Sequence, residues 1–263
     1  MMNSEKKKEF EITFFKDYIT FGISFRIIDI EILKDRYFKT EDKNIKHLIF
    51  LNMVKEFFHF IEDFGAICYG IKQRSIEPSC YIIDTLIDYS TESAKFKNLF
   101  KNCETFKDYS NTLGLKDYYE YFKNFRNINL SEYNKLIEKF ASNLKNIKNW
   151  QQKFMKYYQS LKHFGFIVSK EGIFHKSIVN NNLEYPAIML KERVEGKECY
   201  KPHILKYNDD FIKRTYKNSI ALAIFLIEII VRFIYTHYKY EFVNFLNLSL
   251  KTANILDKKY NSC

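Results

Sequence analysis

The segment from Ile220 to Tyr235 is the most apolar part of this chain and constrains its fold most strongly. Its residues, IALAIFLIEIIVRFIY, are hydrophobic on nearly every face of a helix, which predicts a central, buried helix at about residues 211–239. A transmembrane helix is the competing interpretation. It is disfavoured because Glu228 and Arg232 lie inside the segment, and each ionised side chain would cost about 2.5–3.5 kcal/mol near a bilayer centre. We therefore expect no membrane partner.

Other segments also carry apolar residues at helical spacing. The clearest lies between residues 42 and 72, where apolar side chains recur every three or four positions and charged side chains lie off that line. Similar patterns predict further helices at residues 80–88, 95–126 with an interruption near 111–114, 131–163, and 241–256.

Residues 164–206 differ from the rest, because glycine, proline and asparagine gather there around short apolar groups. This composition predicts loops and short strands, with a hairpin turn at Lys170-Glu171-Gly172. Residues 10–33 follow neither helical nor strand periodicity clearly, so their structure stays open. Only seven glycines and three prolines occur, and none form a linker, which favours one domain over residues 1–263. The predicted fold class is mainly α, an antiparallel helical bundle with a small irregular or β-hairpin insert around residues 164–206.

The chain carries a strong positive charge. Its 42 lysines and arginines outnumber 32 aspartates and glutamates, which gives a formal net charge of +10 at pH 7. Such an excess attracts polyanions through counterion release, and nucleic acid is the natural candidate. The alternative is that the lysines only solvate the outer faces of the helices.

The cysteines and glycines indicate which chemistries to set aside. The cysteines form no CxxC motif and share no zinc-binding spacing with histidines, so we expect free thiols and no metal. No two glycines lie close enough to form a phosphate-binding loop, so we expect no cofactor. The amino terminus lacks an apolar signal core, which predicts a cytoplasmic protein.

Glu228 and Arg232 need an explanation, because charged side chains are rare on a buried helix. They are four residues apart and can form an intrahelical ion pair, which requires no catalytic role. A functional interpretation adds His237, five residues beyond Arg232, where the apolar segment gives way to polar residues. Both interpretations stay open from the residues alone.

The spacing of Arg232 and His237 resembles the R-x4-6-H signature of the HEPN nucleases, in the sequence Arg232-Phe233-Ile234-Tyr235-Thr236-His237. In that family the motif lies late in a long core helix, and two copies meet across a homodimer to form an RNA-cleaving site. The resemblance implies a metal-independent endoribonuclease of the toxin or defence-effector class. The implied partners are RNA, a second copy of the chain, and an antitoxin or acidic protein.

The resemblance also implies roles for individual residues. His237 would move a proton at the RNA 2′-hydroxyl or at the leaving oxygen, a task suited to an ordinary histidine pKa near 6.5. Arg232 would stabilise the charged phosphate of the transition state. Glu228, Tyr235 and Thr236 would surround these two catalytic residues.

Another class of function fits the same sequence, a non-catalytic basic helical protein that binds nucleic acid or an acidic protein. A third candidate is a structural or assembly protein of a mobile element. The first two differ in what they require of the structure. A catalytic site needs Arg232 and His237 in one accessible basic cleft, whereas a structural ion pair needs Arg232 sealed against Glu228.

Overall fold

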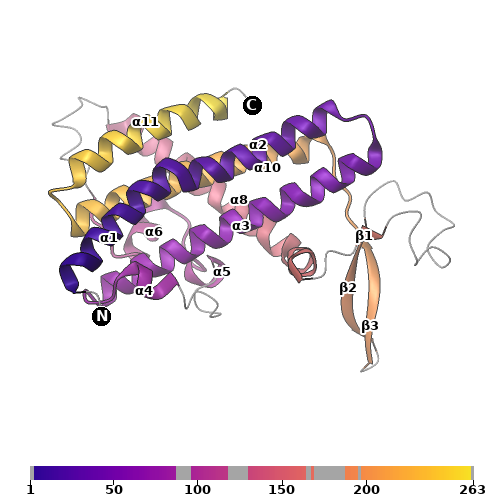
Figure 1. Ribbon diagram of the computed structural model, residues 1–263, viewed down its shortest axis with the longest axis horizontal. Helices are drawn as coiled ribbons and strands as arrows, with labels where there is room; N and C mark the ends of the chain where they lie inside the picture. Colours follow the sequence, from indigo (N-terminus) through magenta and orange to yellow (C-terminus); the bar gives the residue numbers. More distant parts are fainter. Residues whose placement is uncertain are drawn as a thin grey trace. The chain divides into compact units, whose positions relative to one another are not determined.

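The computed structural model describes residues 3–86, 96–117, 130–163, 167–168, 187–194 and 197–261. Helices dominate these residues (Figure 1), which confirms the predicted, mainly α fold class. The chain divides into two compact units, and the single domain expected from the sequence stays a prediction. The first unit contains residues 1–28, 59–148 and 217–263, and the second contains residues 29–58 and 149–216.

The first helices of the chain continue into one another without a break (Figure 1). Helix α1 spans Ser4–Asp17, the π-helical turn η1 spans Tyr18–Gly22, and α2 spans Ile23–Lys39. The residues left open by the sequence, 10–33, are therefore helical. Their periodicity is unclear because apolar side chains occupy two faces, a buried line of Ile12, Phe15, Ile19, Ile23 and Ile27 and an exposed line of Phe10, Phe21, Phe25 and Ile28.

Helix α3 spans Lys43–Ile76 and contains the helix predicted between residues 42 and 72. Its start is set by Asp42, whose carboxylate accepts hydrogen bonds from the backbone N–H groups of Asn44 and Ile45 at 2.8 and 3.0 Å. The apolar line that predicted this helix is buried along its length, at Phe50, Val54, Phe57, Ile61, Phe64 and Cys68.

Three short helices follow in the first unit. They are α4 (Ile82–Leu86), α5 (Phe96–Leu99) and α6 (Phe106–Thr112). A capping box between Thr105 and Asp108 begins α6. After its end, Gly114 has a φ of +66°, which confirms the predicted interruption near residues 111–114. The part of the predicted helix beyond residue 117 lies outside the described residues.

The described residues also form three long helices, namely α8 (Leu130–His163), α10 (Asp209–His237) and α11 (Phe242–Asn261). The bounds of α10 agree to within two residues with those of the core helix predicted at 211–239. Every residue from Ser219 to Ile234 is buried. By length and composition α10 could cross a membrane, but 89% of its most apolar window is buried inside the protein. This is the burial expected of a core helix.

The second unit holds a small antiparallel sheet, with strands β1 (Ile167–Val168), β2 (Ala187–Val194) and β3 (Lys197–Ile204) in that order. β2 and β3 pair along their whole length, from Ala187 opposite Ile204 to Val194 opposite Lys197. The predicted β insert within residues 164–206 is therefore present. The hairpin turn predicted at residues 170–172 lies outside the described residues.

Substitution of Gly114 by alanine tests the turn after α6. A Cβ atom at this position would lie 2.7 Å from the Cβ atom of Ser75, and the positive φ disfavours any L side chain. We expect Gly114→Ala to lower the free energy of unfolding by about 1–2 kcal/mol or more, measured by urea denaturation. Ser142→Ala, at an exposed position on α8, is the control. An unchanged denaturation midpoint for Gly114→Ala would contradict the strained turn.

Candidate functional site

Arg232 lies on α10 with only 5% of its surface exposed. Its Nε atom donates a hydrogen bond to Oε1 of Glu228 at 2.9 Å, one helical turn earlier. Glu228 is itself 9% exposed. The buried ion pair that the four-residue spacing allowed is therefore formed.

Two further groups surround the Arg232 guanidinium. Its Nη2 atom lies 3.5 Å from Oδ1 of Asp117, and its Cζ atom lies 4.4 Å from the centre of the Phe106 ring. The guanidinium thus contacts two carboxylates and the face of one aromatic ring. A phosphate group that bound there would compete with these carboxylates for the guanidinium.

Thr236 and Tyr235 support the end of α10 by different contacts. The hydroxyl of Thr236 donates to the backbone oxygen of Arg232 at 2.7 Å and accepts the backbone N–H of Lys116 at 3.0 Å. It therefore fastens the segment after α6 to α10. The ring of Tyr235 packs against Phe242 of α11, with ring centres 4.9 Å apart. Both contacts hold elements in place.

His237, the last residue of α10, faces a different set of groups from Arg232. Its ring packs against Phe233, with ring centres 4.8 Å apart, and its Nε2 atom is buried without a hydrogen-bond partner among the described residues. Burial, together with the positive charges of Arg74 and Lys116, lowers the pKa of His237 to about 4. His237 is therefore neutral at pH 7.

The structure thus brings together Arg232, Glu228 and Thr236 but gives His237 other neighbours. Five residues along a helix correspond to a rotation of about 140 degrees, which explains why the Arg232 and His237 side chains leave α10 in different directions. The cation whose charge most affects His237 is Arg74 of α3. The pairing of Arg232 with His237 in one catalytic cleft stays a prediction.

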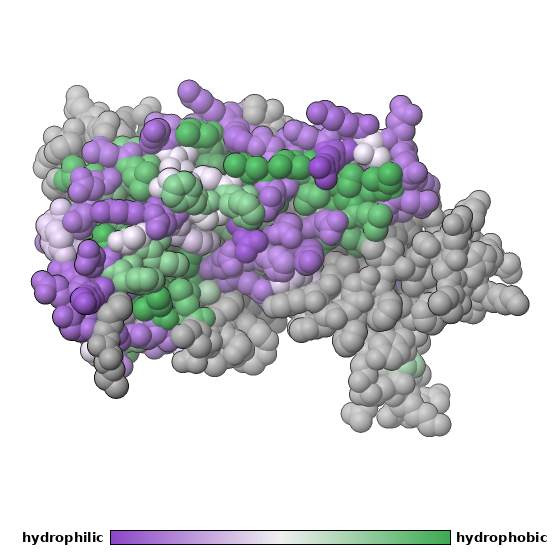
Figure 2. All heavy atoms as spheres, in the orientation of Figure 1, coloured by the Kyte–Doolittle hydropathy of each residue, from purple (hydrophilic) through white to green (hydrophobic). Residues whose placement is uncertain are grey.

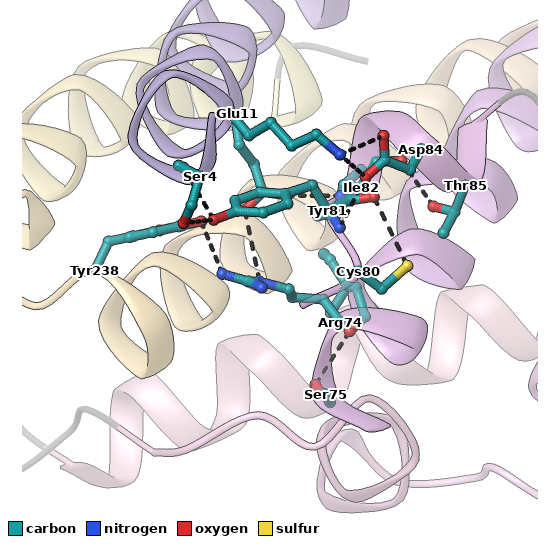
Figure 3. A network of polar contacts seen from close by, with 12 residues as sticks. Ser4, Glu11, Arg74, Ser75, Cys80, Tyr81, Ile82, Asp84, Thr85 and Tyr238 are labelled. Carbon is teal, nitrogen blue, oxygen red and sulfur yellow. Dashed lines mark hydrogen bonds and ion pairs between the residues drawn. The ribbon is translucent and has the colours of Figure 1, made fainter. Parts of the chain in front are cut away.

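A buried polar network lies beside His237, and sequence reasoning did not identify it (Figure 3). The carboxylate of Glu11 accepts hydrogen bonds from the backbone N–H of Ile82 at 2.6 Å and from the hydroxyl of Tyr238. The Nη2 atom of Arg74 donates to the Tyr238 oxygen at 3.4 Å, and its Nε atom lies 3.9 Å from Glu11. The Arg74 guanidinium also lies 4.4 Å from the centre of the Tyr81 ring.

This network joins α1, the end of α3, the start of α4 and the residue after α10. Glu11 is 1% exposed, and desolvation raises its pKa despite the hydrogen bonds that lower it. A buried carboxylate beside a buried guanidinium is costly to separate, because either charge alone would be left in the interior. The network therefore acts first as a structural clamp at this end of the first unit.

The sequence did contain a signal for these two charges. Glu11 precedes the buried residues Phe15 and Ile19 by four and eight positions, which places it on the buried face of α1. Arg74 likewise follows Ile67 and Ile71 by seven and three positions. A charged residue at an apolar helical position indicates a buried partner, but the sequence does not say which one.

A metal site and a ligand pocket are two other kinds of site that the described residues could form. No three His, Cys, Asp or Glu side chains among them gather closely enough to hold a metal ion. A polar pocket of about 320 Å³ lies on α5 and α6, and its lining does not include Arg232 or His237. Its lining consists of Asn98, Leu99, Lys101, Asn102, Cys103, Asp108, Asn111 and Thr112.

Removal of one partner tests the buried ion pair. Arg232→Met leaves the Glu228 carboxylate in the interior without this guanidinium, and we expect the free energy of unfolding to fall by about 3 kcal/mol. In the double variant Glu228→Gln/Arg232→Met, the free energy of unfolding should fall by less than the sum of the decreases in the two single variants. The reason is that the double variant removes both charges of the pair. Additive losses in urea denaturation would show that the two side chains do not interact.

The pKa of His237 can be measured directly by an NMR pH titration of its ring protons. We expect a midpoint near pH 4, which Lys116→Ala should raise because it removes a nearby positive charge. Lys101→Ala is the control. A midpoint near 6.5 in the unaltered protein would contradict the burial of this ring.

The shift also predicts a dependence of stability on pH. The folded protein binds a proton at His237 less readily than the unfolded chain does. The contribution of His237 to the free energy of unfolding is therefore fully present above pH 6.5 and is lost as the pH falls toward 4. Glu11, whose pKa is raised, changes stability in the opposite direction. His237→Gln should therefore be less sensitive to acid than the unaltered protein between pH 6.5 and 4.

Comparisons with known proteins do not assign this chain to a family. A scan against protein-family models and searches of curated proteins and of solved structures found no match. The functional proposals below rest on the residues of this chain.

Proposed function

We propose that this protein is a non-catalytic, basic helical protein that binds single-stranded nucleic acid at the end of α10. The observation that carries the proposal is an exposed aromatic ring flanked by lysines. Tyr240, in the turn between α10 and α11, is 63% exposed, and the Nζ atom of Lys8 lies 4.5 Å from its ring centre. Lys116 and Lys239 are exposed beside the same helix end. We call Lys8, Lys116, Lys239 and Tyr240 the turn patch.

The chemistry of the turn patch suits an unpaired nucleotide. Lysine ammonium groups attract phosphates, and an exposed tyrosine ring offers a face on which a base can stack. Within the described residues, none of the three lysines forms an ion pair with a carboxylate, whereas Lys7 nearby is bound to Asp84 at 2.9 Å. The positive charge of the patch is therefore available to a ligand.

The state of Arg232 supports the non-catalytic proposal over the ribonuclease. A catalytic arginine must reach a phosphate, but this guanidinium is buried and held by Glu228 and Asp117. The cytoplasmic location expected from the sequence agrees with either proposal and stays a prediction. RNA is our preferred ligand, and an acidic protein is the alternative partner.

The metal-independent ribonuclease remains a second candidate, because one observation favours it. His237 is neutral at pH 7 and lies near two cations, Arg74 and Lys116. A neutral imidazole can accept a proton from a 2′-hydroxyl, and nearby cations can stabilise a phosphate. In this proposal the protein would act as a toxin or defence effector, with an antitoxin as a further partner.

Fluorescence anisotropy with labelled single-stranded RNA at several salt concentrations tests the binding proposal. The triple variant Lys8→Ala/Lys116→Ala/Lys239→Ala should bind more weakly and lose about 2 units from the slope of log K against log salt. Tyr240→Ala should weaken binding by roughly tenfold, because stacking of one base contributes about 1–3 kcal/mol. The control is Lys101→Ala/Lys251→Ala/Lys258→Ala, which removes the same charge from exposed positions elsewhere. Equal losses for the two triple variants would contradict a dedicated patch.

The same RNA samples, incubated with EDTA and analysed on a gel, distinguish the two candidates. The non-catalytic proposal predicts intact RNA with every variant. Metal-free cleavage that disappears in His237→Ala, in a protein that still binds RNA, would replace it with the ribonuclease.

A further inference from the structure

The geometry points to a second interaction surface, separate from the turn patch, along the outer face of α1, η1 and α2. Figure 2 shows apolar side chains gathered on the surface over these helices. Phe21 and Phe25 are 68% and 63% exposed, and Phe10 and Ile28 are 43% and 47% exposed. We call Phe10, Phe21, Phe25 and Ile28 the phenylalanine stripe, and we propose that it binds the same stripe of a second copy of this chain.

The spacing places three of the four stripe residues side by side. Phe21, Phe25 and Ile28 follow one another at intervals of four and three residues, so they lie on one helical face. The opposite face of the same segment is buried by Ile12, Phe15, Ile19, Ile23 and Ile27. Core packing therefore already uses one face of these helices, and it does not account for the apolar residues on the other.

The exposed area is close to what a dimer contact needs. With a phenylalanine side chain offering about 200 Å², the four exposed fractions amount to apolar area on the order of 400 Å² per copy. Monomeric proteins rarely expose contiguous apolar patches larger than a few hundred Å². Two such stripes would bury about 800 Å² of apolar area, and the polar side chains around them would have to supply the rest of the roughly 1,200 Å² at the lower end for a specific interface.

The charge of this segment favours a second copy over other occupants. Apart from Glu11, which is buried, the charged residues of residues 10–28 are Lys16, Asp17 and Arg26, so their formal charge is only +1 while the chain carries +10. Lys16 and Arg26 are bound to Glu241 and Asp63, at 3.2 and 2.9 Å.

An acidic protein, a nucleic acid or an anionic membrane would find little excess of positive charge on this face. A neutral stripe of aromatic side chains is, by contrast, complementary to itself. A two-fold axis near Phe21 would bring Phe21 and Phe25 against the same residues of the second copy, in the offset or edge-to-face geometry that aromatic pairs prefer.

Sedimentation velocity of the full chain across the micromolar range tests the proposal. The protein is first freed of nucleic acid, so that association through a bound polyanion does not contribute. We expect a concentration-dependent dimer in the unaltered protein. Phe21→Ser/Phe25→Ser should raise its dissociation constant at least tenfold, which corresponds to about 1.4 kcal/mol. Ile76→Ser/Ile255→Ser removes two side chains that are 67% and 51% exposed elsewhere in the first unit, and it should leave the dimer unchanged. Circular dichroism checks that each variant stays folded.

Two results would overturn the proposal. An unaltered protein that stays monomeric across this range would show that another partner, or none, covers the stripe. A dimer that persists in Phe21→Ser/Phe25→Ser would place the interface on another surface. Neither result bears on the turn patch, which is tested by RNA binding alone.

Discussion

The burial of α10 from Ser219 to Ile234 is the constraint on which the rest of the first unit depends. Every residue from Ser219 to Ile234 is removed from water, so neighbouring helices must supply apolar side chains on all its sides. Phe15 of α1 packs against Phe233, with ring centres 5.3 Å apart, and Phe106 and Tyr109 of α6 pack against Phe225 at the same distance. Helices that are far apart in the sequence are thereby brought around one buried helix.

The same burial dictates how the charges near α10 behave. An arginine taken into an apolar interior needs carboxylates close by, and Arg232 has Glu228 and Asp117. Arg74 is placed in the same way beside Glu11 and Tyr238 (Figure 3). Both arginines therefore have a structural role, because each one compensates the charge of a buried carboxylate. Among the described residues at the end of α10, Lys116 and Lys239 are exposed, and Lys8 lies against the exposed ring of Tyr240.

Much of the fold could be predicted from the sequence, because helical periodicity and the all-apolar segment of α10 are local signals. Residues 10–33 could not, since Phe21 and Phe25 on the outer face obscure the pattern of the buried isoleucines. For the candidate site, the four-residue spacing of Glu228 and Arg232 predicted their contact. The contact of Arg232 with Asp117 and the Glu11–Arg74–Tyr238 network join segments that are 60 or more residues apart. No local sequence pattern indicates which residues of such distant segments meet.

Arg232 belongs to the core, and we propose that polyanions bind instead at the turn patch. This proposal can be tested by NMR spectra of the arginine Nε–H groups and of the tyrosine rings, recorded before and after addition of single-stranded RNA. We expect the Tyr240 ring signals to shift, while the Arg232 Nε–H signal keeps its position and its slow exchange with water. A shifted or rapidly exchanging Arg232 Nε–H signal, with Tyr240 unaffected, would contradict it.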